Sequence, residues 1–208
     1  FWLSICRTSL AVSALRIMLY CHKIMEESPL QNYKARQTAL LGMLFALSMA
    51  LSFLESMLTP FFGLMPAMKL GLSNIVVMYA VLFLNRRSAL YLVLLKALFA
   101  LLTRGVTAGF LSLCGGALSL AVFCLLLALP FTITGYIFSV SGALAHNCGQ
   151  LLGAAALLSD KMAITYAPML LIAGLIVGSC TCMVSRLIFP AVKRIIPPKS
   201  KAESKITF

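Results

Sequence analysis

The sequence predicts an all-α integral membrane protein, a bundle of six transmembrane helices. Of its 208 residues, 62% are hydrophobic and 11% are charged, and the mean hydropathy is +1.02, which is too apolar for an ordinary soluble domain. The apolar runs are continuous rather than alternating, which favours helices over an outer-membrane barrel. Most basic residues lie in the N-terminal arm, one short turn and the C-terminal tail. The net charge of +12 therefore indicates membrane topology rather than nucleic-acid binding.

The N-terminal arm, residues 1–37, is not expected to span the membrane. Arg7 and Arg16 interrupt its apolar segment, and a spanning helix needs about 20 predominantly apolar residues. The alternative is a signal peptide, but no small-residue cleavage site precedes the polar stretch that follows. We expect an interfacial helix on the cytoplasmic side.

Six apolar segments are long enough to be considered as spans. They cover residues 38–58, 70–84, 88–103, 109–129, 133–158 and 162–189. A stretch rich in proline and glycine, residues 60–66, separates the first two segments, and Pro130 and Pro190 end the fourth and the sixth, because proline cannot continue a regular helix. The second and third segments are short for a bilayer, so we expect tilt or shielding by neighbouring helices. Residues 38–189 therefore form the membrane domain, and residues 190–208 form a basic cytoplasmic tail.

The distribution of Lys and Arg predicts the orientation. With the N-terminus in the cytoplasm, nearly all basic residues near span ends lie inside, including Arg86 and Arg87, and only Lys69, Arg104 and Lys161 lie outside. This bias follows the positive-inside rule. We expect a multi-pass protein with both termini in the cytoplasm.

The fifth segment carries a polar group in apolar surroundings. His146 and Gln150 are one helical turn apart and Asn147 lies beside them, so the three side chains share one side of the helix. An unpaired polar group in hydrocarbon is costly, so these residues are expected to face protein or a hydrated pocket. The neighbouring stripe Ala145, Gly149 and Gly153 has the small-residue spacing that lets another helix approach closely. Satisfied packing residues are the alternative interpretation.

Charged residues within or near the spans are mostly cationic. The basic residues are Lys69, Lys96, Arg104 and His146, and the only acidic residue within a span is Glu55. A site with this excess of positive charge suits phosphate, diphosphate or carboxylate. Alternatively, Lys69 and Arg104 extend to lipid headgroups, and Lys96 forms a structural bridge with Glu55. The candidate substrate-binding residues are Glu55, Lys69, Asn74, Lys96, Arg104, His146, Asn147 and Gln150.

A ridge of small residues on the first span, Gly42, Ala46 and Ala50, is a candidate partner interface or an internal packing seam. Catalysis by this chain alone is not expected. Its five acidic residues cannot form the aspartate cluster that holds Mg²⁺ on a diphosphate, and no nucleotide, serine-hydrolase or zinc motif occurs. Gly115 and Gly116 indicate a close helix contact rather than a phosphate loop. We expect no catalytic residue, no metal and no cofactor.

Four stretches resemble one bacterial family. They are MPAMKLGLSNIVVMYAVLF, VLLKALFALLTRG, FLSLCGGALSL and SGALAHNCGQLLGA, and they are similar to heptaprenyl diphosphate synthase component I, also called the Gx transporter family. That family resembles the substrate-binding S components of energy-coupling-factor transporters. The resemblance spans residues 38–189 and implies a six-helix fold in the cytoplasmic membrane, with a pocket open to the outside. It also implies that Gly42, Ala46 and Ala50 dock a coupling subunit, although Gly42 stands where alanine is expected.

Three functions remain open at this point. The first is a substrate-binding transporter subunit for a small anionic or amphipathic metabolite, isoprenoid- or quinone-related, whose partner is an energy-coupling transmembrane subunit with ATPases. The second is a non-catalytic accessory subunit of heptaprenyl diphosphate synthase in menaquinone side-chain synthesis, whose partner is the catalytic prenyl synthase subunit. The third is a structural membrane anchor in which the polar group only joins helices.

Overall fold

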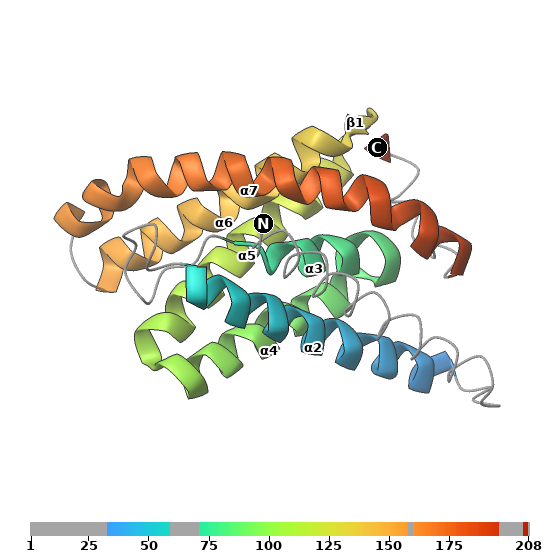
Figure 1. Ribbon diagram of the computed structural model, residues 1–208, viewed down its shortest axis with the longest axis horizontal. Coiled ribbons are helices and arrows are strands. Elements are labelled where there is room, and N and C mark those ends of the chain that lie inside the picture. Colours follow the sequence, from blue (N-terminus) through green and yellow to red (C-terminus); the bar gives the residue numbers. More distant parts are fainter. Residues whose placement is uncertain (1–32, 59–70, 158–159, 196–205, 208) are drawn as a thin grey trace, which may run out of the picture.

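A computed structural model describes residues 33–58, 71–157, 160–195 and 206–207 of the chain. Six helices occur in this part, one for each predicted apolar segment (Figure 1). They are α2 (Tyr33–Leu58), α3 (Asn74–Tyr79) with its π-helical continuation η2 (Ala80–Leu84), α4 (Arg86–Arg104), α5 (Val106–Ala128), α6 (Gly135–Leu157) and α7 (Asp160–Ile195). This part of the chain is mostly helical, as predicted.

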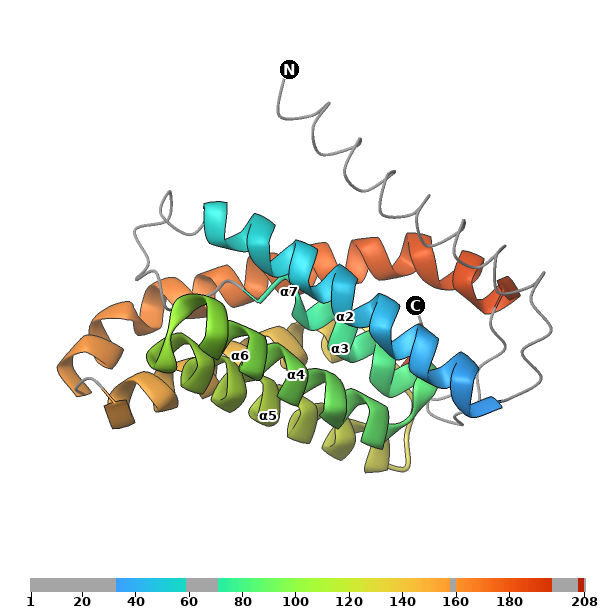
Figure 2. The same ribbon diagram turned by 90° about the horizontal axis from the view of Figure 1, so that it is seen from below.

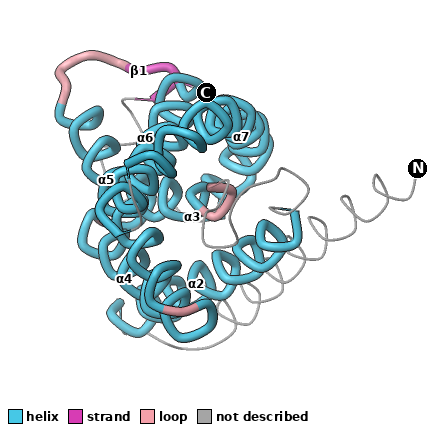
Figure 3. Tube along the Cα trace, turned by 90° about the vertical axis from the view of Figure 1, so that its left-hand side faces the viewer, coloured by secondary structure: helices cyan, strands magenta, loops and turns pink. Residues whose placement is uncertain are grey.

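Helix α3 lies at the centre of the bundle. Figure 3, seen along the bundle, shows α2, α4, α5, α6 and α7 arranged around it, and Figure 2 shows the long helices running side by side. Every residue from Val76 to Leu84 is at most 6% exposed. A helix and π-helix of this length are too short to cross a bilayer alone, and the neighbouring helices cover them, as predicted for this segment.

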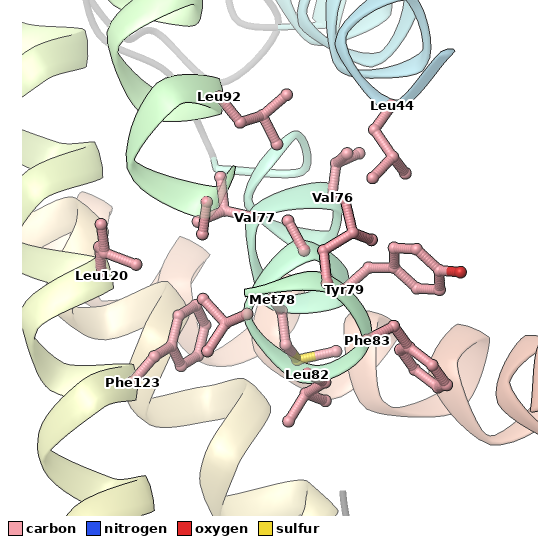
Figure 4. Packing of buried hydrophobic residues seen from close by; sticks show 14 of the residues in the cluster. Leu44, Val76, Val77, Met78, Tyr79, Leu82, Phe83, Leu92, Leu120 and Phe123 are labelled. Carbon is pink, nitrogen blue, oxygen red and sulfur yellow. The ribbon is translucent and has the colours of Figure 1, made fainter. Parts of the chain in front are cut away.

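The main hydrophobic core surrounds α3 and η2. Figure 4 shows Leu120 and Phe123 of α5 on one side of the α3–η2 helix, and Tyr79 and Phe83 pointing to the other side. The rings of Tyr79 and Phe83 stack with centroids 4.7 Å apart. Close van der Waals packing of these side chains against the surrounding helices, which is what drives helix association in a membrane, explains why a short apolar segment can sit inside the bundle.

Three of the helices are long and apolar enough to cross a membrane. These spans are Gln37–Met57, Val106–Ala128 and Ala167–Arg186. These three spans support the prediction that the chain is a membrane protein. The crossing of all six helices, the location in the cytoplasmic membrane and the orientation of the termini stay predictions.

Two of the element boundaries that differ from the sequence prediction have a clear physical reason. Ile133–Thr134 forms a short strand, β1, which pairs in parallel with β2 (Ile206–Thr207), so the fifth helix begins at Gly135 instead of residue 133. β-Branched residues favour an extended conformation, and the tail supplies a partner that the local sequence does not reveal. Helix α7 continues through Pro190 to Ile195, because one proline removes a single backbone donor, a loss that membrane helices tolerate.

Several predicted features lie outside the described residues. These are the interfacial helix within residues 1–32, the Pro/Gly-rich stretch 60–66, Lys69, and residues 196–205 of the basic tail. The domain boundaries at 37/38 and 189/190 both fall within helices, α2 and α7.

Candidate functional site

The polar residues predicted for the site converge around the turn that precedes α3. Six of the eight candidates are buried: Glu55, Asn74, Lys96, His146, Asn147 and Gln150. They come from α2, α3, α4 and α6. Arg104 is partly buried at the end of α4, and Lys69 lies outside the described residues.

Glu55 of α2 binds the backbone of this turn. Its Oε1 accepts a hydrogen bond from the N–H of Gly71 and a second, at 3.3 Å, from the N–H of Leu72. Arg104 lies close enough to interact electrostatically with Glu55. Because both bonds run from α2 to the turn, Glu55 anchors the start of α3 from the neighbouring helix.

Two further contacts anchor the next residues of the turn. Lys96 Nζ of α4 donates to Ser73 Oγ at 2.7 Å, and Ser119 Oγ of α5 donates to Asn74 Oδ1, also at 2.7 Å. All four residues are buried. Because both contacts join different helices, the turn is held by α2, α4 and α5 together.

His146 and Gln150 form a pair on α6. Gln150 Nε2 lies 2.8 Å from His146 Nε2, and an amide nitrogen can only donate. The two side chains are thus hydrogen-bonded to each other across one turn of α6.

Close contact between α5 and α6 holds His146 in place. A Cβ at Gly115 would lie 2.8 Å from His146 Cε1, and a Cβ at Gly149 would lie 2.6 Å from the carbonyl oxygen of Cys114. Both distances are too short for a side chain, so only glycine permits this approach. The predicted packing stripe on α6 and the predicted helix contact at Gly115 are thus confirmed.

Asn147 points toward a different neighbour. Its Nδ2 donates to the carbonyl oxygen of Leu170 on α7 at 2.6 Å. The prediction that His146, Asn147 and Gln150 share one buried side of α6 is confirmed. Their contacts differ, because His146 and Gln150 bond to each other within α6, whereas Asn147 bonds to α7.

Sequence reasoning missed three participants, Gly71, Ser73 and Ser119. Serine is common in membrane helices and gives little signal alone. Ser119 and Asn74 are 45 residues apart, so their pairing cannot be read from spacing. The only available signal was the place of Gly71 and Ser73 beside Asn74 in the sequence LGLSN.

The small-residue ridge of α2 lies on the outside of the bundle. Gly42, Ala46 and Ala50 are exposed, and a Cβ at Gly42 would meet nothing within 4 Å. The inner side of the helix carries Leu44 and Glu55 instead. The ridge is therefore not an internal seam between the described helices.

A family model described as heptaprenyl diphosphate synthase component I matches residues 44–188. The chain belongs to the heptaprenyl diphosphate synthase component I family. The matched region runs from α2 to α7 and contains every polar residue of the site described above. No curated protein and no solved structure matches this component I chain.

Proposed function

We propose that this chain is a membrane-embedded substrate-binding subunit that takes up or presents a small anionic or amphipathic metabolite, isoprenoid- or quinone-related. The observation that carries the proposal is the convergence of buried polar and charged side chains from four helices on one turn. Polar and ionisable groups are rare in membrane-spanning segments and mark binding sites or ion pathways by default.

The balance of charge favours an anionic group. Among the candidate site residues that the structure describes, Lys96 and Arg104 are cationic side chains and Glu55 is the one acidic side chain. A net positive site in surroundings of low dielectric attracts phosphate, diphosphate or carboxylate. Lys69 would add a further cation under the predicted orientation.

In this proposal, partner proteins supply the energy for transport. The exposed ridge of Gly42, Ala46 and Ala50 offers a surface on which another transmembrane helix can approach closely. In the transporter hypothesis this helix belongs to an energy-coupling subunit that works with ATPases, as the likeness to S components of energy-coupling-factor transporters implies.

Ligand retention tests the proposed function. The full chain is purified in lipid nanodiscs, incubated with a total metabolite and lipid extract of the expression host, and analysed by native mass spectrometry. We expect the wild type to retain a small molecule, and Lys96→Ala and His146→Ala to lose it. Ser185→Ala, a buried serine of α7 outside the site, is the control and should retain the molecule. Equal retention in all four proteins would reject the site and leave the polar residues as contacts between helices.

A second candidate function follows from the family description. Heptaprenyl diphosphate synthase component I names a part of a prenyl synthase, and this chain would be its non-catalytic membrane subunit, serving menaquinone side-chain synthesis with a separate catalytic subunit. Adding the chain in lipid vesicles to a soluble prenyl synthase should then raise prenyl elongation above that with empty vesicles. An unchanged rate would remove this candidate.

A further inference from the structure

The basic residues of α4 leave its outer side apolar. Helix α4 carries four of them, Arg86, Arg87, Lys96 and Arg104, and is not among the three spans named above. Figure 3 shows α4 at the periphery of the bundle, between α2 and α5. Lys96 is buried and donates to Ser73, whereas the other three lie in the first and last turns of the helix. None of the four therefore interrupts the outward-facing surface.

This outward-facing surface has the composition and the length of a lipid contact. Every exposed residue of α4 from position 90 to position 102 is leucine, tyrosine or phenylalanine. With a rise of about 1.5 Å per residue, Arg87 and Arg104 are about 26 Å apart along the helix, and the hydrocarbon core of a bilayer is about 30 Å thick. Long basic side chains reach the headgroups from such positions. The cations at both ends of α4 thus fit the two edges of a membrane.

One side of α4 changes in polarity along its length. Arg87, Tyr91, Leu94 and Leu98 follow one another at steps of four, three and four residues, so they share one side of the helix. All four are exposed, Tyr91 by 58% and Leu98 by 57%. Tyrosine is typical of the boundary between headgroups and hydrocarbon. The order of a cation, an amphipathic ring and two aliphatic side chains matches a phospholipid read from its headgroup to its acyl chains.

The charge at the start of α4 favours a lipid with a net negative charge. Arg86 and Arg87 are adjacent and exposed, and the first turn of the helix contains no acidic residue. Guanidinium groups bind phosphate oxygens through paired N–H donors. A zwitterionic lipid places a cationic group beside its phosphate, which two arginines repel, whereas an anionic lipid has no such group. The pair therefore distinguishes lipids by their headgroups.

An acidic protein partner fits this surface less well. It would be attracted by the two arginines, but the side of α4 that continues from them offers only leucine and aromatic side chains. A phospholipid matches both parts, because its phosphate and its acyl chains are joined in one molecule. Clusters of basic residues at the end of a membrane helix are typical of anionic lipid contacts.

We propose that the outer side of α4 binds an anionic phospholipid, with the headgroup phosphate held by Arg86 and Arg87 and an acyl chain lying along Tyr91, Leu94 and Leu98. This inference is independent of the proposed substrate-binding function. It also differs from a role of the arginines in orientation alone, because the positive-inside rule requires charge on one side of the membrane but no preference among lipids.

Lipid titration of the full chain tests this assignment. The protein is purified in detergent and titrated with phosphatidylglycerol, which is anionic, or with phosphatidylcholine of the same acyl chains, which is zwitterionic, and bound lipids are counted by native mass spectrometry. We expect the wild type to prefer phosphatidylglycerol. In Arg86→Gln/Arg87→Gln its affinity for this lipid should fall about fivefold for each arginine removed, corresponding to about 1 kcal/mol, while the affinity for phosphatidylcholine changes less.

The control is Lys193→Gln/Arg194→Gln, a second adjacent pair that lies in the last turn of α7. It lowers the net charge by the same amount and should keep the preference for phosphatidylglycerol. Because Arg86 and Arg87 are exposed, the unfolding temperature in detergent without added lipid should be unchanged in their double variant. Arg87→Gln alone is the second variant if the double variant does not fold.

Three results would overturn the inference. A wild type that binds both lipids equally has no anionic lipid site. An equal loss in the two double variants would show attraction by net charge, without a site on α4. An unchanged preference in Arg86→Gln/Arg87→Gln would leave the arginines to orientation or to an acidic protein partner. Each of these results leaves the proposed function standing, because that function is tested at Lys96 and His146.

Discussion

Lys96 Nζ lies 2.7 Å from Ser73 Oγ and so joins the middle of α4 to the residue before α3. Both side chains are buried, and a hydrogen bond to a charged group contributes about 1.5–3 kcal/mol. Because α3 is at the centre of the bundle, this contact links the candidate site to the packing of the core.

Replacement of Lys96 by methionine should therefore weaken the fold. Lys96→Met keeps most of the side-chain volume but removes the donor to Ser73, so we expect the free energy of unfolding to fall by about 1.5–3 kcal/mol. Thermal unfolding in detergent measures the change. The control is Arg87→Met, at an exposed residue of the same helix, and an equal loss in both variants would contradict the role of this contact.

Alanine at position 149 should disrupt the contact between α5 and α6. A Cβ there would lie 2.6 Å from the carbonyl oxygen of Cys114 and 2.8 Å from Gly115 Cα, and backbone atoms cannot move aside as a flexible side chain can. Overpacking of this kind costs about 1–3 kcal/mol. Thermal unfolding should show the loss in Gly149→Ala but none in Gly42→Ala, where the space is open; a stable Gly149→Ala protein would refute the close approach.

The exposed ridge on α2 predicts an effect on assembly without an effect on folding. Ala46→Leu adds bulk to an exposed position, so the isolated protein should unfold at an unchanged temperature. Co-purification with an energy-coupling transmembrane subunit should be lost, because a leucine prevents close helix approach. Leu102→Ala on the exposed face of α4 is the control. Retained co-purification in Ala46→Leu would remove the ridge as the partner surface.

The predicted orientation can be measured with single cysteines. A cysteine at Arg86, the first residue of α4, should react with a membrane-impermeant maleimide only after cells are opened. A cysteine at Gly105, between α4 and α5, should react in intact cells. Site-resolved mass spectrometry separates these positions from the native cysteines. The reverse pattern would invert the topology, and equal labelling of both would place the two turns on one side.

The sequence predicted the helices well because apolar periodicity and chain breakers are local signals. Each of the six segments contains a helix, and Asn85 separates η2 from α4, although Arg86 and Arg87 of the predicted turn belong to α4. The exceptions depend on distant partners. Ile133 is outside the helix because it pairs with Ile206. The sequence around Ile133 gives no sign of a strand partner so far along the chain.

The sequence predicted which residues belong to the candidate site, but it did not predict their hydrogen-bond partners. A charged or amide side chain within an apolar run is conspicuous, so Glu55, Lys96 and Asn147 could be selected from the sequence. Their actual contacts are the backbone at Gly71, the hydroxyl of Ser73 and the carbonyl of Leu170. Those partners are common residue types whose role appears only when the helices are placed together.

The pairing of β1 with β2 has a practical consequence for shortened versions of the chain. Ile133 is only 5% exposed, and Ile206 packs against the core cluster to which Ile133 belongs. Trimming the polypeptide before residue 206 would remove this cover and wet an apolar side chain beside the α5–α6 connection. A truncated protein would thus differ from the full chain by a packing defect as well as by its missing charge, and assays that attribute any change to the basic residues alone would misassign it.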